Sequence, residues 1–404
     1  MCILQQKFLV FVSLLLLTLV AILGFTFSFK GSFFDGRPFW GLGMSERSNN
    51  KNNNVDSSQP PNLPDFVKPN RKCKVPFGSD RAHLPPCTHS LLRSYYSKMA
   101  SYPECGAWVE TAGYGYSQRY ILDFCEFKPY NLPECSLRNG LQHILFAGDS
   151  VGWRTYLSMV NTSIWAGSNC HLVKSEGTKS RTPSTEYFSV GRRSLNDSFV
   201  VVDRSCVWCR ANVYDCEMRT ESGYHTVRLE FAPAYKFRDP SLTISPGNPK
   251  WSSAETFQEF LFSTYLPMVG MPDAIVLPFP LNHELGNAQV VADFQSLVDL
   301  ILKHVPRTTQ IHWLPTASKF PSKLLPKDRV HLNDGDHSEV YRMASQITKV
   351  LEPYLQNSSY NMYGFVSLFN MSATKEDWNE DSIHFNYLWY AHVIRTLLSI
   401  LCAG

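Results

Sequence analysis

Residues of the types that together perform nucleophilic catalysis occur at two distant places in this sequence. The tripeptide Gly148-Asp149-Ser150 directly follows a short apolar run, and Asp381-Ser-Ile-His384 lies near the end of the 404-residue chain. A serine hydroxyl becomes a nucleophile when a neighbouring base takes its proton and a carboxylate holds that base in the right tautomer. The spacing of Asp381 and His384 lets the carboxylate reach the imidazole Nδ1 while Nε2 faces a third residue. We therefore predict Ser150, Asp381 and His384 as a catalytic triad.

Each motif also has a simpler structural interpretation. A helix is expected over 151–160, and Asp149 or Ser150 could cap its N-terminus by accepting hydrogen bonds from its first N–H groups. Asp381 and His384 could likewise be a helix cap and a solvated loop residue. The combination of the two motifs, in the order Ser, Asp, His within one domain, favours catalysis over these alternatives.

Ser150 is expected where a strand passes into a helix. Residues 143–147 form the short apolar run that precedes it. Open α/β sheets bind their ligands at the carboxyl ends of the strands. A helix N-terminus also offers N–H groups and a dipole that stabilise an oxyanion. The serine hydroxyl is thus predicted beside donors that suit acyl-transfer chemistry.

The C-terminal part of the chain alternates between strand-like runs and helical periodicity. Runs that suit buried parallel strands lie at 143–147, 226–231, 273–277, 310–314 and 364–368. Between them, apolar residues recur at helical spacing: Val290, Val291, Phe294, Leu297, Val298 and Ile301, and then Val340, Met343, Ile347, Val350 and Tyr354. This alternation predicts an α/β fold, a three-layer α/β/α sandwich whose parallel sheet is covered by helices on both faces.

A last apolar stretch, 387–401, raises the question of a second membrane contact. His392 and Arg395 interrupt it, and it is shorter than a membrane span. We therefore expect a core helix that closes the fold.

The N-terminal part of the chain predicts a membrane anchor and a stem. Residues 8–29 carry no charge and are long enough to cross a hydrocarbon core of about 30 Å as a helix. A cleaved signal peptide is the alternative, although the bulky end of the run does not suit a cleavage site. Residues 1–7 would form a short cytosolic tail, and 30–72, rich in Asn, Ser and Pro, a flexible stem. A disulfide-tied, irregular lead-in over 73–140 and a catalytic domain over 141–404 would follow.

The cysteines favour an oxidising, lumenal environment. Of the 11 cysteines, all except Cys2 follow the membrane segment and form an even set suited to disulfides, whose pairing the sequence leaves open. The flanking charges, Lys7 before the segment and Lys30 and Arg37 after it, weakly oppose this orientation. Sequons for N-glycosylation fit secretory passage and lie at Asn161, Asn196, Asn357 and Asn370. We predict a single-pass type II protein of the secretory pathway, with the Golgi as the first expectation.

Two clusters suggest a metal site, and both have a simpler explanation. Cys206-Val-Trp-Cys209 with Cys216 has the spacing of zinc ligands, but no second pair completes a tetrahedron and a lumen favours disulfides. Residues 331–337 include His and Asp side chains that could bind a divalent ion. Their Asp-Gly pair, however, predicts a turn that leads into a helix. We expect no metal and no cofactor, and the net charge of +3, spread over scattered basic residues, argues against nucleic acid as a partner.

Two motifs give the sequence a resemblance to the SGNH or GDSL-type hydrolases: Phe146-Ala-Gly-Asp-Ser150 and Asp381-Ser-Ile-His384. The resemblance covers residues 141–404. It is greatest to the PC-esterase branch, which includes plant trichome-birefringence-like polysaccharide O-acetyltransferases, the NXPE proteins and the lumenal domain of sialate O-acetyltransferase. The resemblance implies a flavodoxin-like three-layer fold and acyl-serine chemistry directed at sugar O-acetyl groups. The membrane anchoring of that branch also matches the first 72 residues.

The resemblance further implies an oxyanion hole. Its donors would be the N–H of Ser150 and the amide of Asn282, which follows the expected strand 273–277. Prolines replace the glycine expected before Asn282, and a loop Asn that caps the next helix is the alternative. The family's other glycine donor has no clear counterpart, with Gly191 and Gly223 as the candidates.

Two residues beside the serine are assigned supporting roles, Asp149 and Arg154. The PC-esterase branch often has an Arg three residues after the serine, whereas Arg154 lies four residues after it. A shared role is therefore in doubt, and a surface salt bridge is the simpler role for Arg154.

These expectations together describe a lumenal, serine-dependent O-acyl esterase or transferase, O-acetyl in the first instance. It would act on a glycan or another acylated substrate through an acyl-serine intermediate. The sequence does not choose between hydrolysis and transfer, because both use the same triad. A catalytically degenerate domain that binds glycan or protein partners is the alternative, motivated by the missing glycine donor. A lipid esterase is a further alternative, which would place apolar residues above Ser150. The sequence leaves the oligomeric state open.

Overall fold

The computed structural model describes twelve stretches of the chain, all within one compact unit that covers Asn62–Gly404. They are residues 84–98, 106–110, 118–122, 124–175, 212–221, 223–234, 237–238, 256–278, 288–314, 316–323, 337–364 and 368–403. The predicted tail, membrane segment and stem, 1–72, lie outside the described residues. None of the described helices combines the length and apolarity that crossing a bilayer requires.

A seven-stranded sheet forms the centre of the described part of the chain, in the order β4-β5-β6-β3-β7-β8-β9. The strands, in that order, are Asn169–Ser175, Asn212–Thr220, Gly223–Pro233, His143–Gly148, Ala274–Pro278, Gln310–Leu314 and Met362–Gly364. The five strands from β6 to β9 run parallel, and β4 and β5 are antiparallel to their neighbours. The α/β prediction is confirmed, and the predicted parallel sheet is present from β6 to β9, whereas the edge formed by β4 and β5 is antiparallel.

The antiparallel edge results from a hairpin that apolar periodicity did not indicate. Thr220 pairs with Gly223, so β5 turns directly back into β6. Gly223 has φ +131°, a conformation that L side chains rarely adopt, and the position therefore favours glycine. The disulfide between Cys170 on β4 and Cys216 on β5 adds a covalent bond across this edge.

The strand predicted over 364–368 is displaced toward the N-terminus in the structure, and 365–367 lie outside the described residues. β9 ends at Gly364, where that strand was expected to begin, and Leu368 is the first residue of α9 (Leu368–Ala373). Leu368 and Met371 are buried in the core from this helix. A short apolar run reports burial but does not by itself distinguish a strand from a buried helix.

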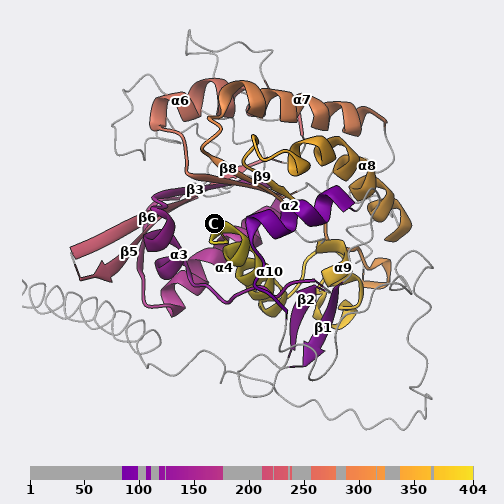
Figure 1. Ribbon diagram of the computed structural model, residues 1–404, viewed down its shortest axis with the longest axis horizontal. Coiled ribbons are helices and arrows are strands. Elements are labelled where there is room, and N and C mark those ends of the chain that lie inside the picture. Colours follow the sequence, from indigo (N-terminus) through magenta and orange to yellow (C-terminus); the bar gives the residue numbers. More distant parts are fainter. Residues whose placement is uncertain are drawn as a thin grey trace, which may run out of the picture. The chain divides into compact units, whose positions relative to one another are not determined.

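Helices cover both faces of the sheet (Figure 1). One face carries α7 (Ala288–His304) and α8 (His337–Gln356), together with a helical stretch made of α5 (Phe257–Phe260), η3 (Leu261–Tyr265) and α6 (Leu266–Val269). The other face carries α3 (Leu132–Asn139), α4 (Ser150–Trp165) and α10 (Tyr387–Leu401). The periodic residues that predicted α7 and α8, such as Phe294 and Ile347, are buried against the sheet. The predicted core helix at 387–401 is confirmed, because α10 is buried over most of its length.

The segment before β3 is more regular than predicted. It contains α2 (His89–Lys98), the antiparallel pair β1 (Gly106–Glu110) and β2 (Gln118–Leu122), and α3. Its buried residues, such as Leu92 and Leu122, belong to the same apolar core as Ile144 of β3. The lead-in and the sheet therefore share one core on this side of the molecule.

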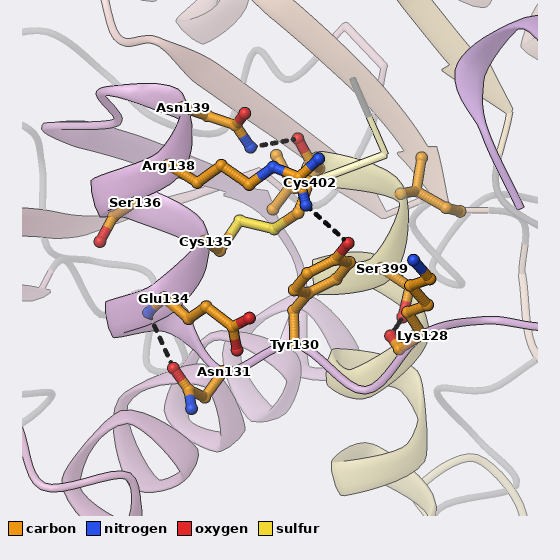
Figure 2. The surroundings of a disulfide bond; sticks show 12 residues. Lys128, Tyr130, Asn131, Glu134, Cys135, Ser136, Arg138, Asn139, Ser399 and Cys402 are labelled. Carbon is orange, nitrogen blue, oxygen red and sulfur yellow. Dashed lines mark hydrogen bonds between the residues drawn. A yellow bond between two sulfur atoms is a disulfide. The ribbon is translucent and has the colours of Figure 1, made fainter. Parts of the chain in front are cut away.

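Two further disulfides tie the lead-in, as the sequence predicted without their pairing. Cys87 is bonded to Cys125, and Cys135 to Cys402. Figure 2 shows Cys135 on α3 reaching Cys402 at the end of α10, beside a hydrogen bond from Asn139 to the carbonyl of Leu401. This disulfide joins the helix that precedes β3 to the helix that follows His384.

Candidate active site

Ser150 lies at the carboxyl end of β3, the strand between β6 and β7. The chain adds β6 on one side of β3 and β7, β8 and β9 on the other, so the strand order reverses at this strand. Such a reversal is where open α/β sheets bind their ligands. The predicted position of the serine, at a strand end and a helix start, is confirmed.

Two glycines allow close packing at the turn into α4. A Cβ on Gly148 would lie 3.3 Å from the Gly152 Cα and 3.3 Å from the Pro278 ring, and a Cβ on Gly152 would also lie 3.3 Å from that ring. Hydrogen in place of a side chain therefore lets the first turn of α4 pack directly on the ends of β3 and β7. This packing fixes the position of the backbone from which the Ser150 side chain projects.

Asp149 is the N-cap of α4. Its backbone is extended, and its Oδ1 accepts hydrogen bonds from the N–H groups of Val151, at 3.0 Å, and Gly152, at 3.5 Å. The side chain is buried beneath the helix end. Of the two residues that could have capped the helix, Asp149 does so, while the hydroxyl of Ser150 bonds a ring nitrogen of His384 instead.

Asp381 and His384 lie in a tight turn between η5 (Glu376–Trp378) and α10. The Glu380 N–H donates to the His384 carbonyl at 2.7 Å, and the Ser382 N–H donates to Asn379 Oδ1 at 2.8 Å. Ser382 has φ 83°, a left-handed conformation whose cost is of order 1–3 kcal/mol for a residue with a side chain. The turn is thus held by its own hydrogen bonds in a conformation that the chain alone would disfavour.

The structure brings the three predicted triad side chains together. His384 Nε2 lies 2.8 Å from Ser150 Oγ, and His384 Nδ1 lies 2.8 Å from Asp381 Oδ2 and 3.0 Å from Oδ1. Ser150 and His384 are 234 residues apart in the sequence, so this convergence is a property of the tertiary structure. The side chain of His384 is 19% exposed, which leaves the ring partly accessible from outside the core.

The environment of Asp381 keeps its carboxyl group ionised. Burial by itself would raise its pKa, but hydrogen bonds from the His384 ring, the His384 N–H and the Ile383 N–H, with the charge of the imidazolium, lower the pKa to about 2. An ionised carboxylate only accepts hydrogen bonds. The proton in this hydrogen bond therefore lies on His384 Nδ1, and in the tautomer with no proton on Nε2 that nitrogen presents its lone pair to the hydroxyl of Ser150. This is the tautomer in which a histidine acts as the base for a serine.

Arg154, one helical turn after Ser150, contacts the turn that carries His384. Its Nη1 donates to Glu380 Oε2 at 2.6 Å and to the Phe385 carbonyl at 3.1 Å. The salt bridge considered for Arg154 is present, and the bond to the backbone is an addition that the sequence did not indicate.

The predicted oxyanion donors can be placed only in part. The N–H of Ser150 belongs to the first residue of α4, at the positive end of the helix dipole. Asn282 and Gly191 lie outside the described residues. Gly223 is wrong as a candidate donor, because it begins β6 in the hairpin, whereas the end of β6 that pairs with Gly148 is Pro233.

The remaining predicted sites divide into placed and unplaced residues. Asn161 lies exposed on α4, Asn357 lies in an exposed turn after α8, and Asn370 lies in α9, while Asn196 is outside the described residues. In the cysteine cluster for which zinc was considered and set aside, Cys206 and Cys209 are not described and Cys216 forms its disulfide with Cys170. The second cluster, 331–337, lies outside the described residues except for His337, which begins α8. No group of potential metal ligands occurs among the residues that the structure describes.

Several residues that support the site were missed by the sequence analysis. The Lys323 ammonium group donates to the carbonyl groups of Glu376 and Asn379, and the Phe320 N–H donates to the Ser382 carbonyl at 2.9 Å. Asn379 and Glu380 stand directly before Asp381 in the sequence, so proximity could have indicated them. Phe320 and Lys323 carry no such signal, because only the fold brings their segment beside the turn.

Comparison of the chain with protein-family models and with curated proteins gave no match.

Proposed function

We propose that this protein is a serine-dependent O-acyl esterase or acyltransferase of the SGNH type, with O-acetyl groups of glycans as its first expected substrates. The single observation that carries this proposal is the continuous set of hydrogen bonds from Ser150 through His384 to Asp381. The hydroxyl, the base and the carboxylate stand in the order and at the distances that nucleophilic catalysis by serine requires.

The reaction follows from these contacts. Ser150 Oγ attacks the ester carbonyl carbon while its proton passes to His384 Nε2, and Asp381 stabilises the resulting imidazolium. When the bond to the leaving oxygen breaks, that oxygen takes the proton from His384, and an acyl-serine remains. Water or a sugar hydroxyl then attacks the acyl carbon and gives its proton to His384, which returns it to Ser150. Hydrolysis and transfer differ only in the acceptor.

Stabilisation of the oxyanion is assigned to the N-terminal end of α4. The N–H of Ser150 belongs to the first residue of α4, at the positive end of the helix dipole, which suits the negative charge that would develop beside Oγ. The amide of Asn282, four residues beyond the end of β7, is proposed as a second donor. Loss of one such donor typically costs about 3 kcal/mol of transition-state stabilisation.

A secretory, lumenal location is proposed with this activity. The disulfides Cys87–Cys125, Cys135–Cys402 and Cys170–Cys216 support an oxidising compartment. The anchor at 8–29 and the sequons belong to the same proposal. A glycosidase-sensitive shift in gel mobility of the full-length protein would be expected, and complete cytosolic reduction of the three disulfides would contradict it.

The test of the proposed function is labelling by a fluorophosphonate. Ser150 Oγ would attack the phosphorus atom, fluoride would leave, and His384 would take the serine proton, so the label requires the nucleophile and its base. We expect full-length wild-type protein to be labelled and the Ser150→Ala and His384→Ala variants to remain folded and unlabelled. Equal labelling of wild-type protein and Ser150→Ala would refute the assignment.

The alternative of a degenerate binding domain is kept because of one observation. Gly223, one of two glycines considered as the missing donor, lies in the β5–β6 hairpin and cannot serve. A domain of this kind would bind acetylated glycans without being labelled and without releasing acetate. Mass spectrometry of an acetylated glycan incubated with the protein distinguishes the two functions.

A further inference from the structure

Arg154 joins the helix that begins with Ser150 to the turn that carries the other two triad residues. Ser150 and Arg154 are four residues apart, so they lie on the same side of α4, one turn from each other. The guanidinium Nη1 donates to the side chain of Glu380 and to the backbone carbonyl of Phe385. These two acceptors stand immediately before Asp381 and immediately after His384.

The two acceptors are also the two ends of one closed turn. The Glu380 N–H donates to the His384 carbonyl at 2.7 Å, and Asn379 and Phe385 form an antiparallel bridge. A bond to Glu380 alone would hold one end of the turn by a long side chain. The bond to the Phe385 carbonyl holds the peptide group between Phe385 and Asn386, one residue beyond His384, and so ties the backbone that follows His384 to α4.

The strength of the ion pair does not explain this arrangement. The side chains of Arg154 and Glu380 are 35% and 50% exposed, and such pairs contribute little to stability in water. Geometry is the property that the contact does supply, because the turn includes the left-handed Ser382 and contacts from outside add to the turn's own hydrogen bonds in keeping that conformation. Lys323 and Phe320 contact the turn from the segment 316–323, and Arg154 contacts it from α4.

We infer that Arg154 is a positioning residue that keeps His384 Nε2 in register with Ser150 Oγ. The inference rests on the proposed function and deepens it. Arg154 acts through the turn of residues 380–385 and takes no part in the bonds that form or break in the reaction. Because a misplacement of about 1 Å in a reacting geometry costs about 100-fold in rate, loss of this contact is expected to reduce turnover strongly and stability little.

The test compares Arg154→Met with Arg119→Met in the full-length protein. Arg119 forms an ion pair with Glu126 whose side chains are 34% and 30% exposed, so its replacement is a matched loss of a half-exposed guanidinium whose partner lies outside the turn of residues 380–385. Two quantities are measured: the rate constant of fluorophosphonate labelling, and amide hydrogen exchange over residues 380–385. For Arg154→Met we expect a labelling rate 10- to 100-fold lower than that of the wild-type protein and faster hydrogen exchange in the turn. The melting temperature of Arg154→Met should equal that of Arg119→Met.

Two further variants separate positioning from other roles. Arg154→Lys keeps one cationic donor and should recover part of the labelling rate, and Glu380→Gln keeps the bond to Phe385 and should lose less than Arg154→Met. With an acetyl ester as substrate, kcat should fall while KM stays unchanged. A rise in KM alone would show that Arg154 binds substrate, and would overturn the inference.

The outcomes keep this inference and the proposed function apart. If wild-type protein is labelled through Ser150 and Arg154→Met matches Arg119→Met in labelling and exchange, the positioning role is wrong and the esterase proposal stands. If wild-type protein is not labelled but the turn exchanges faster in Arg154→Met, the proposed chemistry is wrong and Arg154 still positions the turn.

Discussion

Replacing Asp381 by Asn tests the tautomer that the site geometry requires. Asp381 Oδ1 accepts hydrogen bonds from the N–H groups of Ile383, at 3.3 Å, and His384, at 2.8 Å. In the variant the amide oxygen must remain at this position, because the amide nitrogen cannot accept those bonds. The amide NH₂ group then takes the place of Oδ2, 2.8 Å from His384 Nδ1, and donates to it.

This reversal of one hydrogen bond removes the base. A ring that accepts at Nδ1 carries its proton on Nε2, and Nε2 can then no longer accept the proton of Ser150, 2.8 Å away. A change of this kind in a serine triad lowers turnover about 10⁴-fold, which corresponds to about 5 kcal/mol of activation free energy. The isosteric side chain leaves the packing unchanged.

The assay is steady-state hydrolysis of p-nitrophenyl acetate, with the labelling rate and thermal melting measured in parallel. The matched control is Asp377→Asn, the same substitution at an exposed residue four positions earlier. We expect the control to keep wild-type activity and Asp381→Asn to lose it at a similar melting temperature. An Asp381→Asn variant within about tenfold of wild-type activity would show that the carboxylate does not set the tautomer.

Two further predictions concern packing and pH. Gly148→Ala would place a Cβ 3.3 Å from the Gly152 backbone and from the Pro278 ring, so one of these neighbours must give by a few tenths of an ångström. Because both belong to the packed junction of β3, β7 and α4, we expect a loss of about 1–3 kcal/mol in urea unfolding together with slower labelling of Ser150, and unchanged stability would contradict the close packing. His312 is buried, and burial, with a smaller effect of His89, lowers its pKa from 6.5 to about 3. Between pH 6.5 and about 3, unfolding therefore takes up a proton at His312. The stability that a neutral His312 contributes is complete above pH 6.5 and falls by about 3 kcal/mol as the pH decreases to 4. His312→Phe keeps a ring beside Tyr363, and its free energy of unfolding in urea should decrease less between pH 7 and 4 than that of the wild-type protein. The buried His392, whose pKa is lowered to about 4, keeps its own contribution to the pH dependence. An unchanged pH dependence would refute the role of His312.

Local sequence was sufficient for the elements that depend on local periodicity. The strands β3 and β8 and the helices α7, α8 and α10 were predicted close to their observed bounds. Their buried residues recur along the chain at the period of the element, so the pattern is visible without knowledge of any partner. The position of Ser150 between β3 and α4 was predictable for the same reason, since the strand, the glycine turn and the helix are contiguous.

Pairing across the chain was decided by the tertiary structure. The antiparallel hairpin of β5 with β6, the helix at Leu368 and the partners of the cysteines did not follow from periodicity or spacing. Each of these depends on which residues far apart in sequence become neighbours, and burial alone does not specify that.

The candidate site shows both contributions. The sequence by itself supplied the three residue types and placed Asp381 and His384 within one turn. Only the fold brought His384 Nε2 to 2.8 Å from Ser150 Oγ and placed Arg154 against both ends of that turn. The physical reason is that α4 and α10 pack side by side on the same face of the sheet, an arrangement set by their shared core and closed by the Cys135–Cys402 disulfide. The core and the disulfide both join residues that are far apart in the sequence, so no local stretch of the chain specifies them.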